Sequence, residues 1–92
     1  MKVFQIEGQL DRIFFSNFER VDESIIFDMV LEKLKNNKNV IIGKKIIGPS
    51  EDLYNCKMDD SEFSIIFDLD EGVSIFSKNT SITDKIKRIF NY

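Results

Sequence analysis

Apolar and polar residues alternate with a period of two along much of the chain, and this pattern predicts a sheet. Residues 2–7 (KVFQIE), 52–58 (DLYNCKM) and 62–78 (EFSIIFDLDEGVSIFSK) show the alternation, and residues 40–47 (VIIGKKII) are rich in β-branched side chains. Such alternation places successive side chains on opposite faces of a strand. Residues 9–15 fit either a returning strand or a short helical segment, and we favour the strand.

Two other segments repeat their apolar residues at helical spacing. In the first, apolar side chains recur at steps of four, which predicts a helix at about residues 17–36. Its start has two candidate caps: Ser16, which has capping-box spacing to Glu19, and Asp22. The second segment predicts a short C-terminal helix at about residues 81–90.

Together these elements predict one α+β domain over residues 1–92. It combines an antiparallel meander of three to five strands with the two helices, and the pattern leaves the strand order open. A chain of 92 residues has no room for a second core. Its 42% hydrophobic residues, including nine Phe, supply one dense core, which is not typical of a disordered chain.

Turn chemistry sets the register of the predicted meander. A two-residue turn at residues 59–60 pairs Cys56 with Phe63 on an apolar face. A three-residue loop at residues 70–72, with Gly72 in the left-handed conformation, keeps apolar residues opposite apolar residues in the next hairpin. A register shifted by one residue would mix the two faces.

This register places Leu69 opposite Val73 on the apolar side of the hairpin, and Ile66 opposite Phe76 on the other side. A fully solvated face should be polar throughout, so the second pair needs a cover. We favour a cover by one of the helices or by the N-terminal segment. The alternative is a partner site, in which an apolar centre has a polar rim.

The segment DLDEG, residues 68–72, has three carboxylates and could be read as a cation loop. Calcium, however, takes six to eight oxygen ligands, which a calcium loop of the EF-hand type spreads over about twelve residues. Turns select Asp and Gly for reasons of backbone geometry alone. We therefore interpret the segment as a turn, and we expect no metal and no cofactor.

The chain offers little material for catalysis. It has no His, and Cys56 is its single cysteine, so Ser-His-Asp and Cys-His nucleophiles cannot be assembled. We expect a protein that is not an enzyme. One cysteine also cannot form an internal disulfide, which predicts a reducing, cytoplasmic compartment. No apolar run approaches the length of a membrane span, so we expect no membrane association.

Charge is distributed unevenly along the chain. The net charge is −3 and the pI is about 4.9, which disfavours general binding to nucleic acid. Residues 59–71 contain six acidic residues and neither Lys nor Arg. Such a segment suits a basic protein partner, because complementary charge speeds association.

In its format the chain resembles the small bacterial immunity proteins of contact-dependent growth-inhibition and polymorphic toxin systems. The resemblance rests on length, acidity, the absence of His, a composition rich in Phe, Ile, Asn and Lys, and the strand meander CKMDDSEFSIIFDLDEGVSIFSK. It implies a protein that binds a cognate toxin domain, such as a nuclease, and blocks it. No residue role can be transferred, because the resemblance includes no motif.

Two other functions remain open at this point: a non-catalytic regulatory or adaptor module of bacterial or phage origin, and a homodimer that pairs through an edge strand. For the partner-binding hypothesis, the candidate residues are the acidic side chains of the meander and the apolar pair beside them: Asp59, Asp60, Glu62, Ile66, Asp68, Asp70, Glu71 and Phe76.

Overall fold

A computed structural model describes residues 2–90 and confirms the α+β class. Over these residues the chain forms six strands and two helices, so the strand count exceeds the expected three to five. The elements follow in the order β1 (Val3–Phe4), β2 (Arg12–Phe15), α1 (Glu23–Lys35), β3 (Val40–Ile47), β4 (Glu51–Met58), β5 (Ser61–Asp68), β6 (Gly72–Phe76) and α2 (Thr80–Phe90). Neither of these helices is long and apolar enough to cross a membrane.

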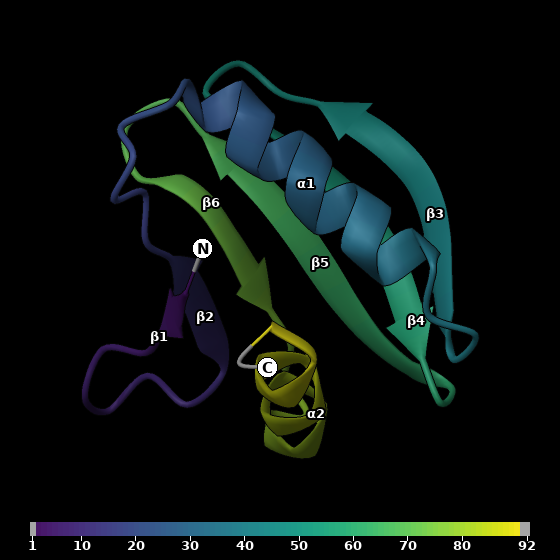
Figure 1. Cartoon of the computed structure of the whole chain (residues 1–92). Helices are drawn as coiled ribbons and strands as arrows, with labels where there is room; N and C mark the ends of the chain where they lie inside the picture. Colours follow the sequence, from purple (N-terminus) through teal and green to yellow (C-terminus); the bar gives the residue numbers. More distant parts are fainter. Residues whose placement is uncertain (1, 91–92) are drawn as a thin grey trace.

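The strands form one antiparallel sheet with the order β1-β2-β6-β5-β4-β3. Consecutive hairpins from β3 to β6 form the predicted meander. The short hairpin of β1 and β2 then pairs with β6, so the beginning of the chain extends a sheet that the later residues build (Figure 1). This arrangement leaves β1 and β3 at the two edges.

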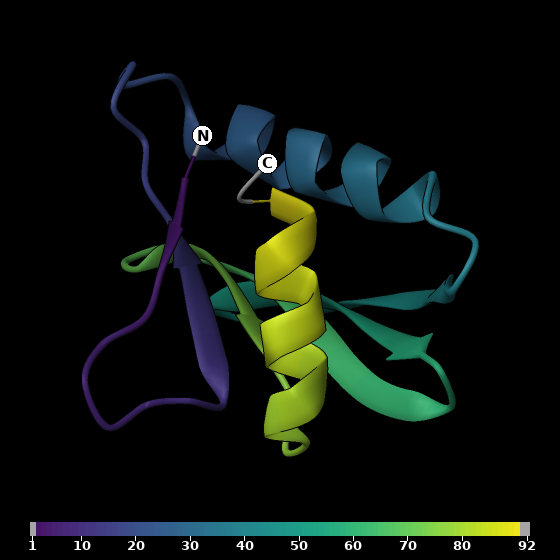
Figure 2. The same cartoon turned by 60° about the horizontal axis from the view of Figure 1, so that its bottom comes forward.

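Both helices pack on the same face of the sheet, as Figures 1 and 2 show. The ring of Phe27 in α1 lies 5.3 Å from that of Phe67 in β5, and the ring of Phe90 in α2 lies 4.9 Å from that of Phe15 in β2. These apolar contacts join the helices and the sheet in one core. Its buried members are Ile13, Phe15, Ile26, Phe27, Val30, Leu34, Cys56, Met58, Phe63, Ile65, Val73, Ile75, Ile82, Ile86 and Phe90.

The helix α1 begins later than expected. Asp22, the second candidate cap, accepts a hydrogen bond from the backbone N–H of Ser24 at 2.9 Å, and the helix starts at Glu23 rather than near residue 17. Before it, the side-chain amide of Asn17 bonds to both the N–H and the carbonyl oxygen of Val21. Because the Asn17 side chain pairs with these two backbone groups of Val21, they do not need the hydrogen bonds of a helix, and the residues before Asp22 form a turn.

The predicted register is right for one hairpin and wrong for the next. The turn at residues 59–60 pairs Cys56 with Phe63, as expected. The positive φ of Gly72 is also as expected. However, Ile66 pairs with Ser74, and Phe76 pairs with Ser64.

The side chain of Asp68 explains the shifted register. It accepts hydrogen bonds from the N–H groups of Asp70 and Glu71 at 2.8 and 3.0 Å, which places the loop at residues 69–71. Leu69, expected opposite Val73, is therefore a loop residue with 75% of its surface exposed. Because the shift is two residues, the side chains that remain in β5 and β6 keep their predicted faces.

Residues 9–15 contain both a turn and a strand. Arg12–Phe15 forms β2, in agreement with the favoured strand. The first strand is shorter than residues 2–7 suggest, since β1 includes Val3 and Phe4 alone.

Candidate protein-binding face

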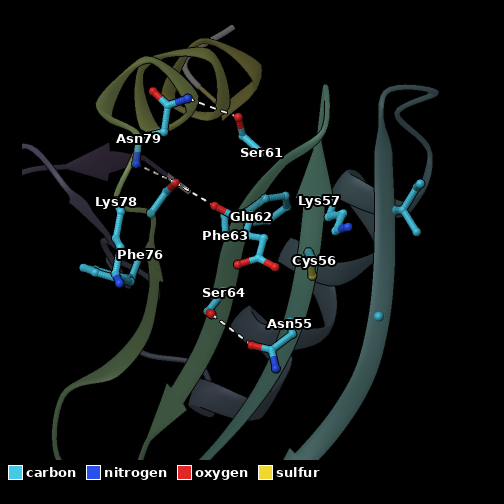
Figure 3. A pocket seen from close by; sticks show the side chains of 13 residues that line it. Asn55, Cys56, Lys57, Ser61, Glu62, Phe63, Ser64, Phe76, Lys78 and Asn79 are labelled. Atoms are coloured by element: carbon cyan, nitrogen blue, oxygen red, sulfur yellow. Dashed lines mark hydrogen bonds between the residues drawn. The ribbon is translucent and has the colours of Figure 1, made fainter.

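The sheet has an open face, defined here as the face opposite α1 and α2, and Figure 3 shows part of it. Two covers were expected for Ile66 and Phe76, a helix or the N-terminal segment. Within residues 2–90 no helix covers this face, and the N-terminal segment contributes part of the cover. The guanidinium of Arg12 in β2 lies 5.4 Å from the ring centre of Phe76, in a cation–π arrangement.

A row of mostly apolar side chains crosses the open face from one edge of the sheet to the other. Each member is the direct cross-strand partner of the next, and we call the set the apolar row: Phe4, Phe14, Ser74, Ile66, Leu53 and Ile46. Its ends are open to solvent, with Phe4 exposed by 48% and Ile46 by 45%. At its centre Ile66 is 7% exposed although it does not belong to the core cluster. The row is therefore a second apolar layer, and all of its side chains come from strands of the sheet.

Carboxylates lie next to the apolar row, at the end of the sheet where β5 turns into β6. Glu51 and Asp68 are direct cross-strand partners, and Asp70 and Glu71 are exposed in the loop that follows. We call these four residues the acidic end. The N–H groups of Asp70 and then Glu71 hold the pKa of Asp68 below its ordinary value, with a smaller contribution from Arg12. Asp68 is therefore ionised at neutral pH.

A carboxylate from the helix layer adds to this negative charge. Glu23, the first residue of α1, lies so close to Gly72 that a Cβ on Gly72 would be 3.1 Å from its carboxyl carbon. One Glu23 oxygen is buried and, within the described residues, has no hydrogen-bond partner. The chain thus directs carboxylates from three of its elements to one end of the sheet.

A groove of about 750 Å³ lies on the other side of the apolar row. Its floor includes Asn55 and Ser64, whose hydroxyl donates to Oδ1 of Asn55 at 3.3 Å (Figure 3). Ile41 of β3 and Phe76 of β6 lie on its two sides. At its far end Lys57 and Glu62 are cross-strand partners, and Lys78 is nearby. The groove therefore combines polar and charged side chains with the apolar side chains of Ile41, Phe63 and Phe76.

The structure divides the predicted site residues between the two ends of the sheet. Ile66, Asp68, Asp70, Glu71 and Phe76 gather at or beside the apolar row. Glu62 is on the open face, in the groove. Asp59 is in the opposite turn, where Lys85 of α2 forms an ion pair with it at 3.0 Å, and its neighbour Asp60 is exposed. The charge of Asp59 is thus already compensated within the chain.

Two features of the described residues bear on chemistry, the thiol of Cys56 and the grouping of the acidic side chains. Cys56 is buried, and desolvation raises the pKa of its thiol, which disfavours the reactive thiolate. Among residues 2–90, no group of three or more Asp, Glu or Cys side chains is arranged to hold a metal ion.

Sequence reasoning missed much of the apolar row, namely Phe4, Phe14, Leu53 and Ile46, and also Arg12. Placing the first two requires the strand order, which the periodicity of a single strand does not contain. A partial signal was present in β2, where Phe14 alternates with the buried Ile13 and Phe15.

Comparison of the chain with protein-family models, with curated proteins and with solved structures gives no match.

Proposed function

We propose that this protein is a non-catalytic inhibitor of the immunity type. It acts in the cytoplasm, where it binds a cognate toxin domain through the open face of its sheet and blocks that domain. The observation that carries the proposal is the apolar row, which no helix covers within residues 2–90 and whose two ends are exposed, with the acidic end directly beside it. An apolar centre next to a charged rim is the usual anatomy of a protein interface.

The arrangement of charge supports a basic partner. Glu51 and Asp68 are direct cross-strand partners on the open face, and the exposed Asp70 and Glu71 follow in the next loop, so negative charge is concentrated beside the apolar row. Opposite charge also steers the encounter and raises the association rate, which suits an inhibitor that must act before its target does.

The absence of His and the burial of Cys56 support inhibition by contact rather than by chemistry. On this account the protein needs no cofactor, and its effect on the toxin comes from occupying the surface that the toxin uses. Tight contact with one partner is sufficient for such a role.

Capture from the native bacterium tests the proposal, with two variants of equal charge. Asp70→Lys with Glu71→Lys reverses two charges at the acidic end. Asp28→Lys with Glu32→Lys reverses two exposed charges on α1, on the far side of the molecule. The proposal predicts that wild type and the α1 variant retain a basic protein that the acidic-end variant loses.

The captured protein must also be toxic when expressed alone, and co-expression of the wild-type inhibitor must restore growth. Capture of a non-toxic regulatory protein would support an adaptor instead. Equal capture of a toxin by both variants would show that the acidic end does not form the binding surface.

A further inference from the structure

We infer that the toxin also contacts this protein at the loop end, through a cationic recess that contains aromatic or other apolar side chains. The loop end is defined here by three segments at one end of the sheet: residues 16–23, 47–52 and 68–72. It includes the acidic end and continues past the open face. The inference rests on the proposed function and adds a further contact surface and the chemistry of the partner that fits it.

Three connections of the chain meet at the loop end, as Figure 1 shows. They are the connection from β2 to α1, the turn between β3 and β4, and the loop between β5 and β6. The N–H of Leu69 donates to the carbonyl oxygen of Ser50 at 3.1 Å, which joins the last two. Glu23, the first residue of α1, lies beside Gly72, which joins the first and the third. The three segments therefore form one continuous surface.

The three most exposed large apolar side chains of residues 2–90 all belong to the loop end. Phe18 is exposed by 79%, Ile47 by 76% and Leu69 by 75%. Single exposed apolar residues are normal on a protein surface, but a group of them with a polar rim marks an interaction site. Turn geometry does not require these residues, because turns select Gly, Pro, Asn, Asp and Ser.

Two of these apolar side chains lie in loops whose backbone is already held in place. The side chain of Asn17 bonds to the N–H and the carbonyl oxygen of Val21, and that of Asp68 accepts two N–H groups of its own loop. Phe18 and Leu69 directly follow these two polar residues. A loop that is ordered before binding loses less conformational entropy on binding, so both tips are suited to anchor a partner.

Charge is separated between the loop end and the rest of the chain. The three segments contain eight of the sixteen acidic residues and one of the thirteen basic residues. Their net charge is therefore −7, whereas the remaining residues carry a net charge of +4. Cationic side chains complement this surface, and exposed apolar tips gain most when they enter a recess of the partner. Arg and aromatic residues, which are enriched in interfaces, supply both properties.

Leu10 provides a matched control for Leu69. Both are exposed leucines in connections between strands, and Leu10 is exposed by 63%. The hydroxyl of Thr83 in α2 donates to the carbonyl oxygen of Leu10 at 2.8 Å, and the N–H of Ser77 donates to that of the neighbouring Asp11. Ser77 directly follows β6, whereas the loop end lies where β6 begins. Leu10 is therefore at the opposite end of the sheet.

A peptide experiment tests the inference without the toxin. The probe is a six-residue peptide of alternating Arg and Trp, blocked at both ends. One control peptide replaces Trp by Gly, which keeps the charge and removes the apolar side chains. A second control replaces Arg by Glu, which reverses the charge. Binding is followed by backbone amide shifts of the isotope-labelled protein.

We expect saturable shifts within residues 16–23, 47–52 and 68–72 with the Arg–Trp peptide, and at least about tenfold weaker binding of both control peptides. Leu69→Ala and Phe18→Ala should each weaken binding of the Arg–Trp peptide by about fivefold or more. Leu10→Ala should bind the peptide as wild type does. All three variants should keep the melting temperature of wild type, because the truncated side chains are exposed.

Four results would overturn the inference: equal binding of the Arg–Gly peptide, equal loss of binding in Leu10→Ala and Leu69→Ala, shifts confined to the groove or to the outer face of α1, or shifts of the loop end that depend on protein concentration without any peptide. The last result would identify a second copy of the chain as the occupant.

The proposed function fails separately from this inference. If Leu69→Ala and Phe18→Ala both captured the toxin as wild type does, the contact at the loop end would be wrong while inhibition through the open face would stand. If the peptide bound as expected and no toxin were captured, the proposed function would be wrong while the loop end would stand as a binding surface for cationic, aromatic partners.

Discussion

Leu53 and Ile66 face each other directly across β4 and β5, at the centre of the sheet face that carries neither α1 nor α2. Their sequence neighbours Tyr54 and Ile65 also face each other, on the opposite side, against the helix layer. Two adjacent residues in each strand thus belong to two different apolar layers. One layer stabilises the fold, and the other is the proposed binding surface.

This division predicts different effects of truncation on the two faces. Ile65→Ala removes a fully buried core side chain and should lower the free energy of unfolding by about 3 kcal/mol. Leu53→Ala removes a half-buried side chain and should lower it by about 1 kcal/mol, yet weaken the affinity for the partner. Urea denaturation and a binding titration measure both quantities. Equal destabilisation by the two changes would contradict a separate layer.

Phe76→Ala tests the same division beside the groove. The ring is half-buried, and Arg12 lies over it, so its loss should reduce affinity more than thermal stability. A melting temperature that falls in parallel with the affinity would instead assign Phe76 to the fold.

Gly72 and Gly8 both have positive φ, but their surroundings differ. A Cβ at Gly72 would crowd the carboxyl group of Glu23, whereas nothing lies within 4 Å of a Cβ at Gly8. Gly8→Ala should therefore show the backbone strain alone, about 1 kcal/mol, and Gly72→Ala should show more. Combining Gly72→Ala with Glu23→Ala should recover the difference. The absence of any recovery in chemical denaturation would exclude the contact as its cause.

The pH dependence of stability should reveal the two carboxylates that accept backbone N–H groups. The N–H of Ser24 lowers the pKa of Asp22, and the N–H of Asp70 lowers that of Asp68, in each case from an ordinary value of 3.8. Because the folded-state pKa is the lower one, their contribution is complete above about pH 3.8 and is lost as the pH falls through the folded values.

Replacing both residues by Asn should therefore flatten the acid limb of the stability curve relative to wild type. Urea denaturation between pH 2 and 7 measures the free energy of unfolding along this acid limb. An acid limb of unchanged steepness in the double variant would show that these hydrogen bonds do not set the two pKa values.

The sequence predicted those features of the fold that depend on residues close together in the chain. The turn at residues 59–60 and strand β3 follow from neighbouring residues, and the structure has both. The faces of β5 and β6 were also right, because a shift of two residues preserves alternation. The exact register of this hairpin was predicted wrongly. The hydrogen bonds that Asp68 accepts start the loop one residue earlier than the pattern of apolar pairs suggests.

The proposed binding face could be predicted only in part, because it is assembled from both ends of the chain. Ile66 and Phe76 stood out as apolar residues on a polar side of one hairpin. Phe14 pairs with Ser74 through the contact of β2 with β6, which joins segments about sixty residues apart. No local pattern fixes such a pairing, so the continuity of the apolar row becomes visible in the structure alone.

The most direct test of the central claim is the association rate of the purified toxin domain, measured at several salt concentrations. The comparison is between wild type, Asp70→Lys with Glu71→Lys, and the equally charged Asp28→Lys with Glu32→Lys. If the acidic end steers the partner onto the open face, the first variant associates about ten times more slowly at low salt, and the difference shrinks as salt screens the charges. The α1 variant then stays close to wild type, and all three melt at similar temperatures. Identical association rates for the two variants across the salt range would contradict the account.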